Sequence, residues 1–193
     1  MSGRVIIVLE SERINFRQFC AEDAQSLFEL DSDPEVMRFI SKGQPTPLSQ
    51  IQDEIIPRFL EYYSHTPPRG FWAAQLRSTG EFIGWFHLRP IKSSPDEMDL
   101  GYRLKRSVWG QGLATEGSRA LMKQGFDHWG YQKITAHTKA SNLASRRVLE
   151  KAGLVFEFEF HYGGAVMGNW STGEDNRSVK YSVTRAEFLQ RQS

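Results

Sequence analysis

Hydrophobic and polar positions recur along the chain with two periods, one typical of helices and one of strands. Apolar residues three or four positions apart mark helical segments, whereas short apolar or alternating runs mark strands. The pattern predicts strands at Arg13–Phe19, Phe71–Leu76, Phe82–Leu88, Met98–Leu104, Lys133–Thr138, Val155–Tyr162 and Ser178–Val183. It predicts helices at Ala24–Leu30, Pro34–Ile40, Gln50–Tyr63, Thr115–Trp129 and Asn142–Ala152.

Prolines and glycines divide these elements and predict local breaks. Pro57 lies inside the third predicted helix and should kink it, because proline removes a backbone N–H. The turn at 78–81 joins two strands into a hairpin, and the segment 93–96 is expected to be a loop. A glycine-rich loop over 163–176 is long enough to shape a pocket. We therefore expect a single α/β (α+β) domain over residues 1–193, with one sheet layer covered by helices.

Charge and composition narrow the function classes. Lys and Arg number 24 against 23 Asp and Glu, for a net charge of +1, and no dense basic stripe indicates a nucleic-acid partner. The apolar run Val5–Leu9 is too short to span a membrane. Cys20 is the one cysteine and the five histidines are scattered, so neither a disulfide nor a metal site is expected. These features predict a cytoplasmic protein without a metal cofactor.

The segment Trp109-Gly110-Gln111-Gly112-Leu113-Ala114-Thr115-Glu116 carries the clearest chemical signal. It lies between a predicted strand and a predicted helix, where small residues let amide N–H groups approach an anion. The pattern does not fit a dinucleotide fingerprint, because Lys133–Thr138 ends without an acid, and it lacks the Lys of a Walker loop. A phosphate-bearing ligand is the first hypothesis, and close helix packing is the alternative.

A second cluster, Ser141 to Gly153, opens the helix after the next strand. Its polar end should face the same crevice as the glycine segment. The alternative is structural, because Ser141 or Asn142 can cap a helix whose apolar positions are buried.

Together with Asp99-Leu100-Gly101-Tyr102, these two clusters resemble the GNAT superfamily of acetyl-CoA N-acetyltransferases, and in particular its RimJ/RimL-type branch, which acetylates ribosomal-protein N-termini. The segments 10–17 and 33–37 also fit that branch, so the similarity covers nearly the whole chain. The resemblance implies a mixed, mostly antiparallel sheet with a splayed central parallel pair, flanked by helices.

The resemblance also implies how acetyl-CoA would bind. The pantetheine arm would lie between the strands ending near Leu104 and Thr138, with main-chain contacts from Leu104. Asn142 would contact the pantetheine and Arg147 would lie near the nucleotide. The diphosphate would be held by the main-chain amides of Trp109, Gly110, Gln111, Gly112, Leu113, Ala114 and Thr115.

For the reaction, the resemblance implies direct attack of a neutral amine on the thioester, with the oxyanion polarised by a main-chain N–H beside Leu104. Asp99 is the candidate acceptor for the amine proton, and a solvated surface acid is the alternative. Ser145 is the candidate donor to the leaving thiolate, and a helix cap is the alternative. Cys20 is not expected to act as a nucleophile.

The acceptor pocket is expected between the helices of 33–63 and the loop 163–176. Candidate acceptor-binding residues are Glu35, Trp72 and His87, with Trp85, Tyr162 and Trp170 as further aromatics that could line the pocket. Each has a structural alternative as core or as a helix-dipole partner. The acceptor is expected to be a protein or peptide N-terminus. The alternatives are a small amine (polyamine, amino acid or aminoglycoside) or a non-catalytic acetyl-CoA-binding module. A homodimer through the late edge strand also stays open.

Overall fold

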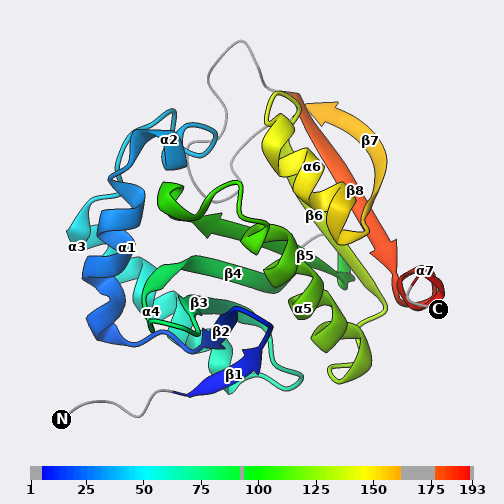
Figure 1. Ribbon diagram of the computed structural model, residues 1–193, viewed down its shortest axis with the longest axis horizontal. Helices are drawn as coiled ribbons and strands as arrows, with labels where there is room; N and C mark the ends of the chain where they lie inside the picture. The colour runs from blue at the N-terminus through cyan, green and yellow to red at the C-terminus, as the bar shows by residue number, and fades with distance from the viewer. Residues whose placement is uncertain (1–5, 92–93, 162–176, 192–193) are drawn as a thin grey trace.

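The fold is an eight-stranded sheet with helices on both faces, seen in Figure 1. The computed structural model describes residues 6–91, 94–161 and 177–191. The strand order is β1-β2-β3-β4-β5-β6-β8-β7, with β5 and β6 parallel and the other neighbours antiparallel. The strands are β1 (Ile7–Glu10), β2 (Ile14–Arg17), β3 (Gly70–Leu76), β4 (Phe82–Ile91), β5 (Ser94–Leu104), β6 (Lys133–Lys139), β7 (Val155–His161) and β8 (Arg177–Thr184).

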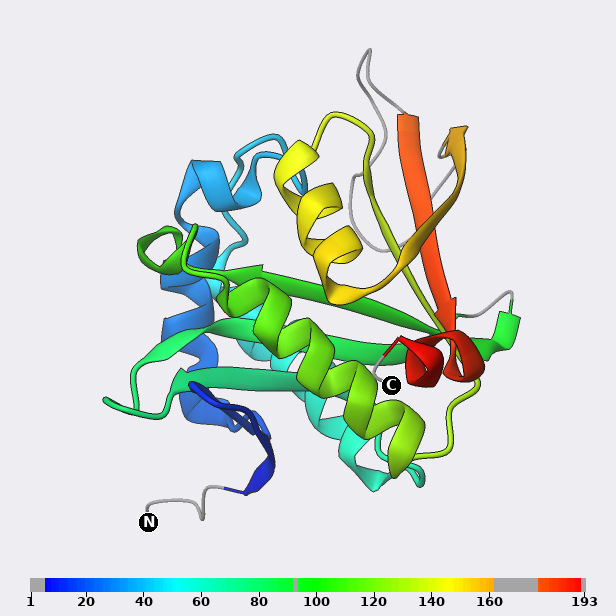
Figure 2. The ribbon, with the colours of Figure 1, turned by 45° about the vertical axis from the view of Figure 1, so that its right-hand side comes forward.

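The parallel pair at the centre of the sheet is splayed. The register between β5 and β6 covers Glu97–Asp99 against Lys133–Thr135, although β5 continues to Leu104 and β6 to Lys139. Figure 2 shows the two halves of the sheet meeting near the start of both strands and then diverging. The mixed sheet with a splayed central pair, expected from the resemblance, is confirmed.

Two apolar cores hold the helices against opposite faces of the sheet. One core packs α5 (Leu113–Asp127), α6 (Leu143–Ala152) and α7 (Arg185–Gln190) on the face that carries Phe86, Leu88 and Leu100. The other core packs α1 (Ala24–Asp31), α2 (Pro34–Met37), α3 (Leu48–Gln50) and α4 (Ile56–Glu61) over β3 and β4. Each face therefore buries the apolar side chains of its own alternate strand positions.

The predicted helix over 50–63 is broken by a π-helical segment, η2 (Ile51–Ile55). Pro57 has no N–H to give to the carbonyl four residues earlier, so an α-helical ladder cannot run through it. The helix widens just before this proline, and the Ile56 N–H bonds to the Ile51 carbonyl instead. The expected kink is thus a change of helix type on the N-terminal side of Pro57.

Other boundaries differ from the predictions. The expected loop at 93–96 is wrong, because β5 begins at Ser94 and lies against the long strand β4. Strand β1 was not predicted, and neither was α7, which opens with a reciprocal cap between Thr184 and Glu187. That cap is visible in the sequence as a Thr followed three residues later by a Glu. Among the described residues no helix is long and apolar enough to cross a membrane.

Candidate active site

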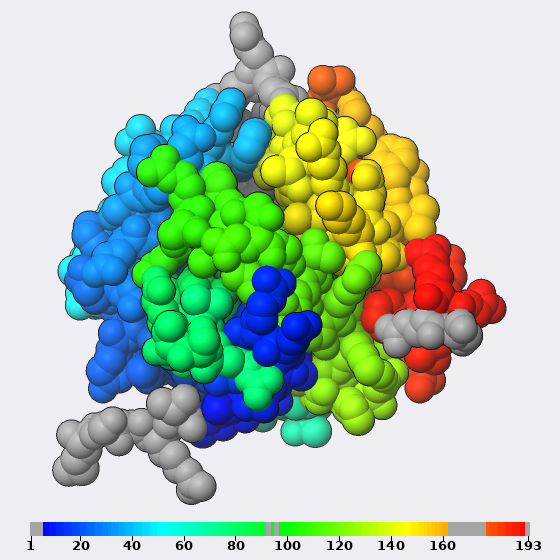
Figure 3. Space-filling view, viewed as in Figure 1, coloured from blue at the N-terminus to red at the C-terminus, as the bar shows by residue number. Residues whose placement is uncertain are grey.

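A pocket of about 780 Å³ lies where β5 and β6 diverge. Its walls come from α2, β4, β5, β6, α6 and the segment between β5 and α5. In the space-filling view the surface is hollowed between α2, that segment and α6 (Figure 3). Thirteen of the fifteen candidate site residues line the pocket: Glu35, His87, Asp99, Leu104, Trp109, Gly110, Gly112, Leu113, Ala114, Thr115, Asn142, Ser145 and Arg147.

The segment before α5 has the backbone that an anion site requires. Gly110 has φ 74° and Gly112, the N-cap of α5, has φ 80°, in the left-handed region that glycine adopts without strain. The N–H groups of Leu113, Ala114 and Thr115 belong to the first turn of α5, where a helix has no internal acceptor for them. These amides and the positive end of the helix dipole can hold a diphosphate at this corner of the pocket.

Arg13 and Glu116 fix this segment to the N-terminal part of the sheet. The Glu116 carboxylate accepts hydrogen bonds from Ser11 Oγ, Arg13 N and Arg13 Nε, each at 2.7 Å. Arg13 Nη1 also donates to the Gln111 carbonyl at 3.0 Å. Gln111 is the predicted loop residue that does not line the pocket, because its side chain donates back to the Ser107 carbonyl. Gln111 and Glu116 thus shape the loop from outside.

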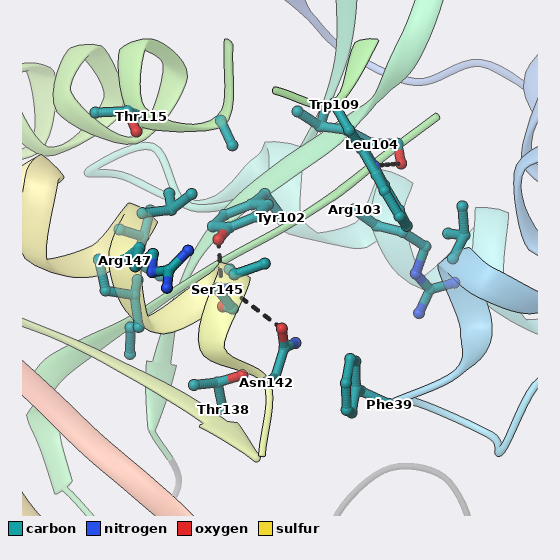
Figure 4. A pocket seen from close by; sticks show the side chains of 18 of the residues that line it. Phe39, Tyr102, Arg103, Leu104, Trp109, Thr115, Thr138, Asn142, Ser145 and Arg147 are labelled. Atoms are coloured by element: carbon teal, nitrogen blue, oxygen red, sulfur yellow. Dashed lines mark hydrogen bonds between the residues drawn. The ribbon is translucent and has the colours of Figure 1, made fainter. Parts of the chain in front are cut away.

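Trp109 closes the loop onto the end of β5. Its indole Nε1 donates to the Leu104 carbonyl at 2.9 Å, a bond drawn in Figure 4. The Lys105 N–H donates to the Ile83 carbonyl, and this bond shows which alternate residues of β5 turn their main-chain groups toward β4. By that alternation the main-chain groups of Tyr102 and Leu104 point away from β4, into the gap toward β6. The gap is therefore edged by backbone that an extended ligand arm can pair with.

The start of α6 brings a hydroxyl pair to the gap. Asn142 is the N-cap, and its Oδ1 accepts from the Ser145 backbone N–H at 3.1 Å. The capping alternative for Ser145 is therefore wrong, because the cap is Asn142 and the Ser145 hydroxyl bonds elsewhere. Tyr102 Oη donates to Ser145 Oγ at 3.2 Å (Figure 4). Burial raises the pKa of Tyr102 to about 12, so its phenol keeps its proton.

The side chains of Asp99 and Tyr102 lie on opposite faces of β5. Hydrogen-bond donors enclose the Asp99 carboxylate. His87 Nε2 lies 3.1 Å and Arg89 Nη2 3.0 Å from Oδ2, and His137 Nδ1 lies 3.3 Å from Oδ1. Burial alone raises the pKa of this carboxyl, but the bonds from His137 and His87 and the charge of Arg89 hold it well below its usual range. Asp99 is thus a paired anion on the pocket wall, and not a solvated surface acid.

Gly101 makes room for this cluster. A Cβ on Gly101 would lie 2.4 Å from Cε1 of His87, so the imidazole sits directly over the bare backbone of β5. The ring also contacts Trp85 and Phe71, at centroid distances of 5.7 and 5.1 Å. Burial lowers the pKa of His87, more than its bond to Asp99 raises it. His87 therefore stays neutral and donates its Nε2 hydrogen to Asp99.

Of the other residues predicted to line the acceptor pocket, some lie in the pocket and one lies in the core. Glu35 and Trp85 line the pocket. Trp72 does not: it is 1% exposed and stacks on Trp129 in the core under α5, so its structural alternative holds. Within 33–63, the pocket is lined by α2 and by the three residues that follow it, 38–40. Helices α3 and α4 pack in the second core instead. Tyr162, Trp170 and the loop 163–176 lie outside the described residues.

Three residues that the fold brings to the site were not predicted from the sequence: His137, Tyr102 and Arg13. Tyr102 stands in the quoted Asp99–Tyr102 motif, and strand alternation could have placed its side chain opposite Asp99. No sequence signal pairs His137 with Asp99, because that contact depends on the register between two strands 38 positions apart. Within the described residues no group of three or more His, Cys, Asp or Glu is placed to hold a metal ion.

Comparison with known proteins agrees with this geometry. Residues 13–155 match the acetyltransferase (GNAT) domain family. The FsC-acetyl coenzyme A-N(2)-transacetylase of Aspergillus fumigatus is 29% identical over 197 residues, 95% of this chain and 79% of the relative. The protein YkkB of Bacillus subtilis (strain 168) is 31% identical over 152 residues, 76% of this chain and 84% of that protein.

Solved structures support the fold. A GNAT-family acetyltransferase from Bacillus anthracis has a TM-score of 0.76 at 20% identity, covering 92% of this chain and 98% of that one. An aminoglycoside acetyltransferase in complex with coenzyme A has a TM-score of 0.71 at 22% identity, covering 93% and 99%. The glycine loop, the splayed strands and the family match lead to one assignment: this chain belongs to the GNAT acetyltransferase family and is an acetyl-CoA-dependent N-acetyltransferase.

Proposed function

We propose that the acceptor is the α-amino group of a protein or peptide N-terminus, as in the RimJ/RimL-type branch. The charge of the pocket wall carries this proposal. Among the described residues that line it, the acids are Glu35 and Asp99, and both are already engaged with arginines. The same wall carries six cationic side chains: Arg38, Arg89, Arg103, Lys139, Arg147 and Lys151.

This balance disfavours a polycationic acceptor. Polyamines and aminoglycosides carry several ammonium groups, each of which needs a carboxylate or an equivalent acceptor when it leaves water. A peptide N-terminus brings one amine next to neutral amide groups, and an amino acid brings one amine next to a carboxylate. The Aspergillus relative acts, by its name, at an N(2) nitrogen. A non-catalytic module is set aside, because the family assignment is that of an enzyme.

A thiol-release assay with matched acceptors tests the proposal. We expect kcat/KM for a short peptide with a free N-terminus to exceed that for spermidine or kanamycin at least about tenfold, equal to about 1.4 kcal/mol. The same peptide with a blocked N-terminus is the control, and it should give no release above background. Preference for either polycation would contradict the proposal, and preference for a free amino acid would move it to the small-amine class.

In this proposal each group of pocket residues has its own part in binding acetyl-CoA or in the reaction. The amides of Gly110 and of Gly112 to Thr115 hold the diphosphate, whereas the Trp109 N–H already donates to the Arg106 carbonyl. Leu104 and Asn142 contact the pantetheine, with Arg147 near the nucleotide. A main-chain N–H of β5 facing the gap polarises the thioester carbonyl. Ser145 donates to the leaving sulfur. Support for that role is the Tyr102 bond, because a hydroxyl that accepts from Tyr102 has its own hydrogen free to point into the pocket.

Single and double substitutions at Tyr102 and Ser145 test this hydroxyl pair. We expect Ser145→Ala to lower kcat about tenfold to a hundredfold, within the range of general acid catalysis, with little change in KM for acetyl-CoA. Tyr102→Phe should lower kcat less. The double variant should fall no further than Ser145→Ala, because both changes interrupt one hydrogen-bonded chain. Additive losses would show two independent roles, and an unchanged kcat in Ser145→Ala would remove Ser145 from the chemistry.

A further inference from the structure

The acceptor side of the pocket contains a linked set of four side chains centred on Asp99. His87 and Arg89 project from β4, Asp99 from β5 and His137 from β6, all on the sheet face opposite α5 and α6. The Asp99 side chain is 14% exposed and that of His137 is 22% exposed. Three donors on one carboxylate make this a preorganised arrangement.

Asp99 is a weak proton acceptor in this setting. Its two oxygens accept from His87, Arg89 and His137, and its pKa lies well below the usual range for a carboxyl group. A general base works best when its pKa is near the working pH. A carboxylate held this firmly in its ionised form orients its neighbours better than it takes a proton from an amine.

His137 has the nitrogen that the reaction needs. An ionised carboxylate only accepts hydrogen bonds, so the ring nitrogen 3.3 Å from Asp99 Oδ1, Nδ1, must carry the hydrogen. The neutral ring then has its lone pair on Nε2. His137 lines the pocket beside the splay, two positions after Thr135, the last β6 residue that pairs with β5. Its ring is set edge to face against Phe160 of β7, at 5.6 Å between centroids, which limits its rotation.

The charged neighbours of His137 come from every adjoining strand. Asp99 lies beside it on β5, and His87 and Arg89 stand behind Asp99 on β4. Across β8, Lys180 is its register partner, and that amine is paired with Glu97 and Glu157 at 2.9 and 3.1 Å. The ion pairs leave Asp99 as the anion in direct contact with the imidazole.

We propose that His137 is the catalytic proton acceptor for the amine and that Asp99 is a positioning residue that fixes the His137 tautomer. The inference rests on the proposed acetyl transfer. As the nitrogen lone pair forms the N–C bond, the nitrogen gives one proton to His137 Nε2, which releases it to solvent. The C–S bond breaks toward sulfur, and the thiolate takes up a proton on the Ser145 side of the strand.

Kinetics of His137→Gln test the proposal, with whichever amine the wild-type enzyme uses best. We expect kcat to fall about 100-fold and KM for acetyl-CoA to stay within about twofold. His128→Gln, at the exposed end of α5, is the matched control and should match the wild type. A wild-type kcat in His137→Gln would overturn the proposal and return the proton to Asp99.

A second measurement needs no acceptor and stays informative if the peptide assignment fails. Nitrogen NMR of the imidazole rings in the folded protein should show neutral His137 protonated at Nδ1, and Asp99→Asn should shift the ring toward the Nε2-protonated form. A wild-type His137 protonated at Nε2 would overturn the proposal. The acceptor assay alone judges the peptide proposal, so the two failures are distinguishable.

Discussion

Gly112→Ala should raise KM for acetyl-CoA about 100-fold, equal to about 2.7 kcal/mol of binding. Gly112 has φ 80°, where a Cβ costs about 1–2 kcal/mol. Space is not the obstacle, because the nearest atom to an added Cβ is Arg13 Nη2 at 3.6 Å. The strain is relieved by rotating the peptide planes beside Gly112, which turns first-turn amides away from the diphosphate.

Gly80→Ala is the matched control for this prediction. Gly80 has φ 73° in the turn between β3 and β4, and an added Cβ would meet nothing within 4 Å. Both variants should lose about 1–2 kcal/mol of stability in urea titrations, but Gly80→Ala should bind acetyl-CoA like the wild type in calorimetry. If Gly112→Ala also kept wild-type affinity, the diphosphate would not be held by this loop.

Asp99→Asn should lower kcat about 100-fold, the same loss as His137→Gln because Asp99 acts through His137, and leave acetyl-CoA affinity within about threefold. An amide cannot hold the His137 tautomer as a carboxylate does, and it leaves Arg89, 23% exposed, without its counter-charge. Steady-state kinetics and calorimetry on the folded variant measure the two effects separately. Equal losses in kcat and in acetyl-CoA affinity would indicate a structural role only.

Glu97→Gln is the control for charge on the same strand face. Glu97 is ion-paired with Lys133 and Lys180 two positions before Asp99, and it does not line the pocket. We expect its kcat to remain close to the wild-type value. A loss of kcat in Glu97→Gln as large as that in Asp99→Asn would show that any anion on this face supports the reaction.

Asp99 should also affect how stability depends on pH. Its pKa is lowered in the folded protein, so its contribution is complete above the unfolded value, near 3.9, and is lost as the pH falls toward the folded value. Denaturant unfolding should therefore show the wild type losing its advantage over Asp99→Asn below about pH 4. An advantage that grew on acidification would contradict the lowered pKa.

The sequence predicted the parts of the site that are local in the chain. Gly110 and Gly112 stand at a strand-to-helix junction, and Asn142 opens a helix, so turn and capping preferences were enough to place them. The mixed sheet and its splayed parallel pair came from the resemblance, because nothing in the spacing of strands reveals which of them are parallel.

What the sequence could not predict depends on the register between strands and on which face of the sheet each side chain lies. Trp72 and Trp85 lie on neighbouring strands with similar composition, yet one packs under α5 and the other lines the pocket, because their positions fall on opposite faces of the sheet. His137 became significant only once β5 and β6 were paired with Asp99 opposite Thr135. Asp99 was found by motif, but its enclosure by donors depends on three strands.

Side chains alternate along β5, so the odd-numbered and even-numbered positions of this strand lie on different sides of the sheet, one for each substrate. We expect Asp99, Gly101 and Arg103 to face the acceptor, because they lie on the sheet face opposite α5 and α6, and Leu100, Tyr102 and Leu104 to face the helices and the thioester arm. New amine preferences can therefore arise by changing odd-numbered positions of one strand while the even-numbered ones keep the acetyl donor in place. Such a division makes this strand a natural target for redirecting the enzyme to other amines.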